Sequence, residues 1–367
     1  MAISRRLFIQ GAAAGFVASN FGLLGCAKAK SSWFVSACSD KAGQHYVAAF
    51  DLAGNVINQI ALPARGHDAI ALPHKPGHAM VFARRPGMFA LEVDFVNARV
   101  VKQVTPENDS HFYGHGVYWA KHHVILTSEN YFSTGEGQIV VRDADSYQQL
   151  ARYYSGGIGP HEIALMPDNE TLVIANGGIK THPDMPRQKL NLDTMDPNLA
   201  YMSLLSGKVL ESYQLDNKQL SIRHLDVSQS GKVIAGLQYQ GAKTDLVPLV
   251  ISHSGESQLT PLSAEDSLWR QMNHYTASIC VDDDNQLVAV SCPRADLITL
   301  WSLADNRFIS KHKLADGAGL TKTDQLYASS GKGYLTNEFL LNAAEHEFKT
   351  RFTHLKWDNH LTHIQAV

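Results

Sequence analysis

Histidine is the residue type whose number and spacing in this sequence point most directly to chemistry. The chain has 18 histidines among 367 residues, and six of them stand where a short apolar segment begins. These six are His67, His115, His161, His224, His274 and His354. Neutral imidazole is the commonest protein ligand for metals and suits copper, iron, zinc and nickel. We expect copper or iron as the cofactor if the fold brings the six side chains together.

Each of the six histidines opens a repeated unit, shown by "GPHEIALMPDNETLVIANGG" from residue 159. A Gly, a Pro or a polar residue precedes the histidine, and an apolar segment, a polar turn and a second apolar segment follow it. The units begin near residues 65, 113, 159, 222, 272, 317 and 352, and the unit at 317 has Ala318 and Gly319 in place of the histidine. Most spacings are roughly 45 to 50 residues, which is typical of four-stranded propeller blades.

The two ends of the chain complete each other. Residues 32–61 read as three strands without a first, whereas the last unit, from residue 352, supplies a first strand without the rest. The sequence therefore predicts an all-β fold over residues 31–367, a seven-bladed β-propeller of four-stranded blades closed by pairing of the N- and C-terminal strands. A misread boundary would make the ring six- or eight-bladed.

The predicted fold places the first strand of each blade beside the central channel, so the six histidines would form a ring there. Strand alternation places Asp226 on the same side as His224, and it points Asp68 and Glu162 away. Arg223 would orient a neighbouring acid or bind an anionic ligand. We therefore interpret Arg223 and Asp226 as groups that support the metal ligands, with salt bridges between blades as the alternative. Residues 179–201 hold three prolines and predict a long inserted loop.

The first 26 residues have the layout of an export signal. Arg5 and Arg6 form a twin-arginine pair before an apolar stretch, which points to the Tat route. The stretch ends in "LLGC", which resembles a lipobox with Cys26 as the lipidated residue. We expect a periplasmic protein held to the membrane by a lipid anchor, and a plain signal cut near Ala27 or Ala29 is the alternative.

The sequence lacks the motifs that mark several classes of protein function. The formal net charge is −3 and there is no Lys/Arg run, so nucleic-acid binding is not expected. The sequence has no GxSxG, no HExxH and no phosphate-binding glycine loop. Cys38, Cys280 and Cys292 form no CxxC pair, and we interpret them as small buried hydrophobic residues.

The segments "GIGPHEIALMPDNETLVIANGGIKTHPDMPRQKLNLDTMDPNLAY" and "LSIRHLDVSQSGKVIAGLQYQG" carry a family resemblance. From about residue 30 to 360 the chain resembles an uncharacterised family of exported bacterial propellers. Its members are commonly encoded beside imelysin-like, iron-regulated periplasmic proteins, so the resemblance implies these partners and a role in periplasmic iron or metal uptake. The step "PHEIALMPDN" also resembles the strand starts of YVTN-type propellers.

A looser similarity concerns the channel. Nitrous oxide reductase has a seven-bladed propeller whose inner histidines hold a copper cluster, but this chain has no cupredoxin domain for a second copper site, which argues against the same reaction. Three functions stay open. The first is a metal-binding module that acts in iron uptake, with the 179–201 loop covering the site. The second is a propeller enzyme, lactonase- or oxidoreductase-like, with a histidine as acid–base or metal ligand. The third is an interaction scaffold with structural histidines.

Overall fold

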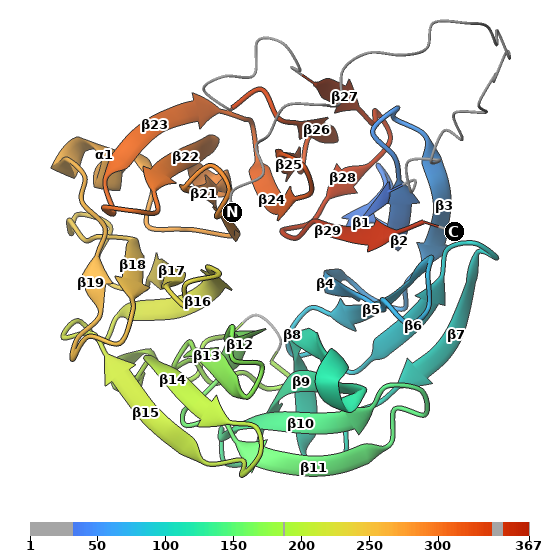
Figure 1. Cartoon of the computed structure of the whole chain (residues 1–367), viewed down its shortest axis with the longest axis horizontal. Coiled ribbons are helices and arrows are strands. Elements are labelled where there is room, and N and C mark those ends of the chain that lie inside the picture. Colours follow the sequence, from blue (N-terminus) through green and yellow to red (C-terminus); the bar gives the residue numbers. More distant parts are fainter. Residues whose placement is uncertain (1–31, 186–187, 340–347, 367) are drawn as a thin grey trace, which may run out of the picture.

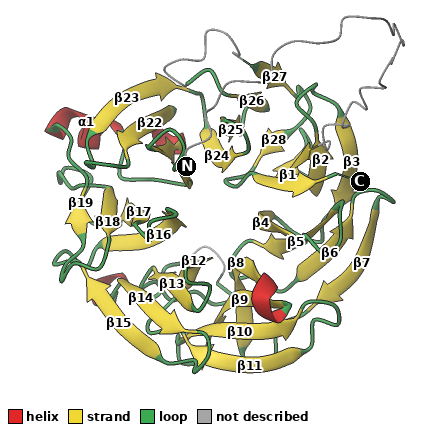
Figure 2. Cartoon of the chain, in the orientation of Figure 1, coloured by secondary structure: helices red, strands yellow, loops and turns green. Residues whose placement is uncertain are grey.

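A computed structural model describes residues 32–185, 188–339 and 348–366. Almost all of these residues are strand or loop (Figure 2), and the one α-helix among them is the short α1 (Asp266–Gln271). No helix in the described ranges has the length and apolar character needed to cross a membrane. The predicted export motif, with Arg5, Arg6 and Cys26, lies outside the described residues.

Seven antiparallel sheets form a ring around a central axis (Figure 1). Six of them are blades of four consecutive strands, and within each blade the first strand along the chain is the innermost and the last is the outermost. The first blade contains β4 (Gly66–Ala71), β5 (His78–Ala83), β6 (Ala90–Asp94) and β7 (Arg99–Val104). The second contains β8 (Ser110–Trp119), β9 (Val124–Tyr131), β10 (Gly137–Asp143) and β11 (Gln149–Tyr154). The third contains β12 (Pro160–Leu165), β13 (Thr171–Asn176), β14 (Asn198–Ser203) and β15 (Val209–Gln214). The fourth blade contains β16 (Leu220–Val227), β17 (Val233–Tyr239), β18 (Val250–His253) and β19 (Thr260–Pro261). The fifth contains β20 (Ile279–Asp282), β21 (Leu287–Cys292), β22 (Leu297–Ser302) and β23 (Phe308–Lys313). The sixth contains β24 (Gly317–Lys322), β25 (Leu326–Ser330), β26 (Tyr334–Thr336) and β27 (Lys349–Arg351).

The seventh blade joins the two ends of the described chain. Its outer strands are β1 (Ser32–Ser39), β2 (His45–Phe50) and β3 (Val56–Ala61), and its inner strand consists of two pieces, β28 (Lys356–Trp357) and β29 (Thr362–Gln365). Both pieces pair antiparallel with β1. The predicted seven-bladed propeller and its closure by both ends of the chain are therefore confirmed.

The burial of the strands explains how the blades hold together. Middle strands such as β5 and β6 are buried almost throughout because neighbouring blades cover both of their faces. The outermost strand of the same blade, β7, is exposed at five of its six residues. The three cysteines predicted to be buried hydrophobic residues, Cys38, Cys280 and Cys292, are buried and form no disulfide.

The predicted loop between the second and third strands of the β12–β15 blade is shorter than 179–201. Its last residues, 198–201, belong to β14, which pairs with β13. The described part of the loop contains one turn of 3-10 helix at Leu192–Thr194. Tyr113 of the neighbouring blade fixes the start of the loop, since its hydroxyl donates to the Ile179 carbonyl oxygen at 2.6 Å.

Candidate functional site

Five histidine side chains converge in the central channel. His67, His115, His161 and His224 lie on the innermost strands β4, β8, β12 and β16, and His360 lies two residues before β29. Each of the five is at most 6% exposed. We refer to these five residues as the histidine cluster, and it contains four of the six histidines that the repeat predicted.

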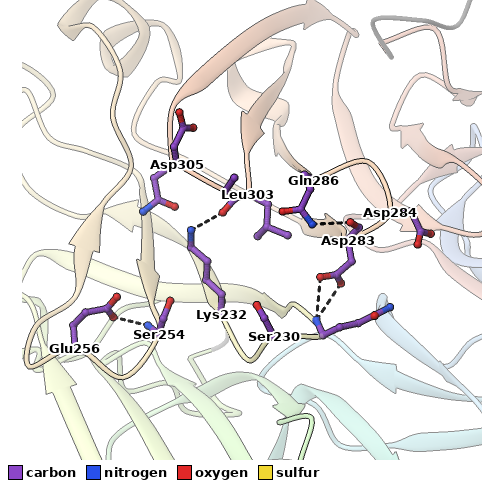
Figure 3. A pocket seen from close by; sticks show the side chains of 12 residues that line it. Ser230, Lys232, Ser254, Glu256, Asp283, Asp284, Gln286, Leu303 and Asp305 are labelled. Atoms are coloured by element: carbon purple, nitrogen blue, oxygen red, sulfur yellow. Dashed lines mark hydrogen bonds between the residues drawn. The ribbon is translucent and has the colours of Figure 1, made fainter.

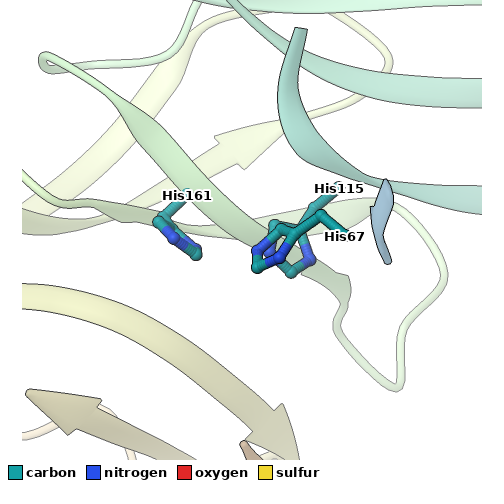
Figure 4. A group of neighbouring side chains, drawn as sticks. All are labelled: His67, His115 and His161. Carbon is teal, nitrogen blue, oxygen red and sulfur yellow. The ribbon is translucent and has the colours of Figure 1, made fainter. Parts of the chain in front are cut away.

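The imidazole rings of the cluster touch one another. The ring centroids of His161 and His224 are 4.5 Å apart, those of His67 and His115 are 4.8 Å apart, and those of His67 and His360 are 4.6 Å apart. Figure 4 shows His67, His115 and His161 reaching the same space from three blades. Rings this close contact each other rather than the backbone of their own blades.

Irregular pairing in the inner strands turns these side chains into the channel. The register between first and second strands shifts between Gly66 and Ala69 in β4, and between Pro160 and Glu162 in β12. Equivalent shifts occur in β8 and β16 at their histidines. Such a β-bulge adds unpaired residues to one strand and redirects its side chains. Consecutive residues at these places can therefore both face the channel.

The bulges overturn the orientations expected for the acidic neighbours. Asp68 and Glu162 do not point away, because the Oδ2 atom of Asp68 lies 3.3 Å from His115 Nδ1 and Glu162 Oε2 lies 3.0 Å from His224 Nδ1. Asp226 makes no such contact with His224. Its carboxylate accepts hydrogen bonds from the amides of Val227 and Val281, at 2.8 and 2.7 Å, and thereby ties β16 to β20.

Burial keeps the cluster uncharged at neutral pH. It lowers the pKa of His115 and of His360 to about 4. Burial and the neighbouring imidazoles also hold the pKa values of the other three, His67, His161 and His224, well below the usual value for histidine. Neutral imidazole has a free lone pair, and this is the form that binds metal ions.

Several ring nitrogens of the cluster have no hydrogen-bond partner among the described residues. They are Nδ1 of His67, both nitrogens of His115, Nδ1 of His161 and Nε2 of His360. A buried polar atom without a partner costs free energy, so native proteins contain few of them. These five atoms belong to four residues, and each neutral imidazole can offer one lone pair. A ligand that accepts these lone pairs would explain why the atoms have no protein partner.

Two triads of the cluster have spacing that suits a metal ion. In His67–His115–His161 and in His115–His224–His360, one nitrogen from each residue lies within 4.8 Å of the other two. Two nitrogens of a tetrahedral site are about 3.4 Å apart when each metal–nitrogen bond is about 2.05 Å. Metal binding would draw the nitrogens together by about 1.4 Å at most, a movement that side-chain rotations supply.

His274 and His354 are not part of the ring, contrary to the expectation from the repeat. His274 lies in a turn, with φ of 56°, ahead of β20, and its Nε2 lies 2.8 Å from the Asp245 carbonyl oxygen. Ser278 directly precedes β20 instead. His354 is exposed in the turn between β27 and β28.

His360 is the cluster member that the repeat pattern did not identify. The inner strand of the closing blade is interrupted between Trp357 and Thr362, and His360 lies in this interruption. Its backbone is fixed there, because the Ser36 hydroxyl donates to its carbonyl oxygen at 2.6 Å. The repeat pattern places a histidine immediately before or at the start of each inner strand. Applied to the last unit, this pattern selects His354 for the ring. The sequence "WDNHLTH" also offers His360, but only the pairing with β1 distinguishes the two.

Two other features of the described chain lie outside the cluster. His74, His123 and Asp145, in the turns that follow β4, β8 and β10, bring three ligand atoms within 4.8 Å of one another, with Asp145 exposed. A cavity of about 750 Å³ lies between the β16–β19 and β20–β23 blades (Figure 3). Its polar groups bind one another, as when Lys232 Nζ donates to the Leu303 carbonyl oxygen at 2.6 Å. This cavity shares no residue with the histidine cluster, so we place the candidate site at the cluster.

Two cavities with different lining residues reach the cluster. One, of about 120 Å³, is lined by His67, His161 and His224 together with basic residues that include Arg223. The other, of about 440 Å³, is lined by His360 and by the three carboxylates Asp68, Glu162 and Asp226. Burial raises the pKa of Asp68 to about 6 and that of Asp226 to about 7.

Comparison with known proteins assigns the chain to a family. The model of the family described as "Protein of unknown function (DUF1513)" matches residues 60–364, and the chain belongs to this family. Among solved structures, Kuenenia stuttgartiensis hydrazine synthase is similar, with a TM-score of 0.61 and 12% sequence identity over 84% of this chain and 91% of that chain. This likeness concerns the fold alone. A search of curated proteins found no match.

Proposed function

We propose that the chain, as a member of this family, binds a transition-metal ion, copper or iron, through the histidine cluster. The observation that carries the proposal is the set of buried ring nitrogens without partners at the point where five blades meet. A metal ion would accept the lone pairs of His67, His115 and His161, or those of His115, His224 and His360. The bound ion would supply a Lewis-acidic or redox-active centre.

The arrangement of the cluster argues against a purely architectural role for these histidines. A structural histidine normally bonds a backbone group or a neighbouring side chain, as His274 and His253 do. In the cluster, His224 bonds Glu162 in this way, whereas the other four imidazoles are buried against one another with no such bond among the described residues. Clustering of neutral imidazoles without partners destabilises the apoprotein, since the desolvation of each unpaired polar atom costs about 1–3 kcal/mol. Such a cost is expected where the site is built for a ligand.

The carboxylates beside the cluster suit a metal site. A metal-binding histidine commonly donates its second ring N–H to a carboxylate, and this orients the ring and raises its basicity. Glu162 is placed to accept from His224 Nδ1, and Asp68 lies beside His115 Nδ1. These acids can also join the ligand set, because sites with two imidazoles and one carboxylate are typical of non-haem iron.

The place of action that we propose is the periplasm. The twin-arginine pair and Cys26 support Tat export and a lipid anchor, and the resemblance to propellers encoded beside imelysin-like proteins supports a role in iron or metal uptake with such partners. Membrane fractionation tests the anchor. Cys26→Ser should move the exported protein from the membrane to the soluble periplasmic fraction, whereas Arg5→Lys/Arg6→Lys should keep it in the cytoplasm. Wild-type protein that stays in the cytoplasm would contradict this part of the proposal.

A titration of metal-stripped protein tests the metal site itself. Isothermal calorimetry with Cu²⁺, and anaerobically with Fe²⁺, should give saturable binding with a stoichiometry close to one ion per cluster. The triple variant His115→Ala/His161→Ala/His224→Ala should lose this binding while circular dichroism shows an intact fold. The matched control is His274→Ala/His354→Ala, which removes two histidines outside the cluster and should bind as the wild type does. Equal losses in both variants would contradict the assignment of the site.

A further inference from the structure

The smaller cavity beside the histidine cluster is strongly basic. We name it the basic vestibule and define it by five cationic side chains among its lining residues, which are Arg84, Arg85, Lys189, Arg223 and Arg294. None of its lining residues within the described ranges is an Asp or a Glu. The residues come from distant parts of the chain, including the loop before β14, which contributes Lys189. The fold therefore concentrates positive charge beside three of the cluster histidines.

Arg223 is a buried cation of the vestibule whose guanidinium lacks a counter-charge within the described part of the chain. It is only 1% exposed, and its Nε and Nη1 atoms have no hydrogen-bond partner among the described residues. Burial and the nearby Arg85 lower its pKa to about 9. Arg142, which is also buried in this fold, shows the usual solution, since its Nη2 donates to Glu129 at 2.6 Å. A buried guanidinium without a counter-charge is costly unless an anion binds to it.

The other cations of the vestibule also lack carboxylate partners. The arginines that form ion pairs with Asp or Glu within the described ranges are Arg65, Arg99, Arg142, Arg152 and Arg307. Arg294 instead stacks on the Tyr275 ring, with its guanidinium carbon 4.0 Å from the centroid. Arg85 lies over the Tyr113 ring at 5.1 Å. These aromatic contacts fix the guanidinium planes and leave most of their N–H groups free for a ligand.

We propose that the basic vestibule binds a small anion, with Arg223 at the base of the site. The cationic side chains would bind the carboxylate or phosphate-type oxygens of the anion. Arginine is suited to such oxygens because its N–H groups form two parallel charge-assisted hydrogen bonds with them. The cavity of about 120 Å³ has room for an oxyanion or a small dicarboxylate. Arg84, Arg294 and Lys189 are exposed at its rim and would attract the anion from solution.

The position of the vestibule gives the anion a second role. His67, His161 and His224 line the vestibule and also belong to the histidine cluster. An anion held by Arg223 therefore lies against the cluster and can complete the coordination of a metal ion there. This second role rests on the proposed function, whereas the anion site itself does not.

Calorimetry on the metal-stripped full chain tests the site with inorganic phosphate, oxalate and malonate as probes, and with chloride at equal ionic strength as the reference. At least one of the three probes should bind with near-unit stoichiometry, and the probe that binds tightest distinguishes a phosphate site from a carboxylate site. Thermal unfolding should shift upward with the same probe. No saturable binding by any of the three probes would overturn the proposal.

Variants locate the binding. Arg223→Gln should weaken the anion by about tenfold or more, and Arg294→Gln, at an exposed position, should weaken it severalfold even if the first variant folds poorly. Arg307→Gln is the matched control, because Arg307 pairs with Asp305 on the surface, and it should bind as the wild type does. Unchanged anion binding in folded Arg223→Gln and Arg294→Gln would contradict the site. If the protein binds the anion but takes up no metal, the anion site stands and the proposed metal-binding function is rejected. If it takes up metal but binds none of the anions, the metal-binding function stands and the anion site is rejected.

Discussion

Glu162 connects the histidine cluster to the backbone around it. Its Oε2 atom accepts hydrogen bonds from His224 Nδ1 and from the Leu225 amide, each at 3.0 Å, and its Oε1 lies 3.9 Å from His115 Nδ1. The carboxylate thus holds one imidazole in a fixed tautomer and lies beside a second. A group in this position sets how readily the rings bind a metal ion.

Glu162→Gln should therefore weaken metal binding about 10- to 100-fold, since the amide keeps the size of the side chain but loses the charge. Competition against a chromophoric chelator measures the change. Glu170→Gln is the control, because Glu170 pairs with Lys121 on the surface. Equal metal affinity in Glu162→Gln and Glu170→Gln would show that the carboxylate does not act on the cluster.

At the residue scale the repeat pattern predicted part of the site. His67, His115, His161 and His224 follow the repeated motif and lie together, as expected. His274 does not, because residues of a turn separate it from the strand that it was expected to open. The orientations of Asp68 and Glu162 required knowledge of the bulges, since alternation along a regular strand points them the other way.

At the element scale, the bulged inner strands need a glycine where two of them meet. Gly114 has φ of 109°, which side chains other than glycine rarely adopt, and a Cβ added there would lie 2.7 Å from His67 Cδ2. The close approach of β8 to the His67 ring therefore depends on the missing side chain. Pairing of this kind is invisible in a single sequence, where Gly114 only marks a Gly-His step.

Gly114→Ala should lower both stability and metal affinity, because the added methyl group strains the backbone and displaces His67. Gly43→Ala is a matched control, since Gly43 has φ of 82° with nothing within 4 Å of an added Cβ. The control should lose stability through strain alone, about 1–2 kcal/mol, and keep its metal affinity. Urea unfolding and the chelator competition provide the two readouts. An affinity in Gly114→Ala equal to that of the control would contradict the role of this contact.

At the scale of the whole molecule, the closing blade holds the ring together. Ile364 on β29 pairs with Trp33 on β1, is 1% exposed and packs in the core that the closing blade shares with the β4–β7 blade. The sequence predicted this closure and the number of blades, because the incomplete units at its two ends add up to one blade. It did not predict that the inner strand of that blade would be split, which is what places His360 in the channel.

Ile364→Ala should lower the free energy of unfolding by about 2–5 kcal/mol, as expected for truncation of a buried isoleucine. Ile309→Ala, at a position 37% exposed on the outermost strand β23, should cost less than about 1 kcal/mol. Urea unfolding curves give both values. If the two variants lose the same stability, the closing strand contributes no more than the surface does.

A metal ion bound by the histidine cluster would link blades that are far apart in the sequence. Its removal should lower the unfolding temperature of the whole protein, because ligand binding to the native state alone stabilises it by about 2.7 kcal/mol when the free ion is at 100 times its Kd. Calorimetric scans with and without a chelator test this. A variant without the cluster histidines, His115→Ala/His161→Ala/His224→Ala, should show no chelator effect, and an equal shift in that variant would place the stabilising ion elsewhere.

The central claim is that the histidine cluster is a metal site, and elemental mass spectrometry of protein purified from the periplasm without a histidine tag tests it most directly. We predict near-stoichiometric copper or iron in the wild type and in His274→Ala/His354→Ala, and its loss in a folded His115→Ala/His161→Ala/His224→Ala variant. A wild type that contains no metal and also takes up no added iron, copper or zinc would contradict the claim.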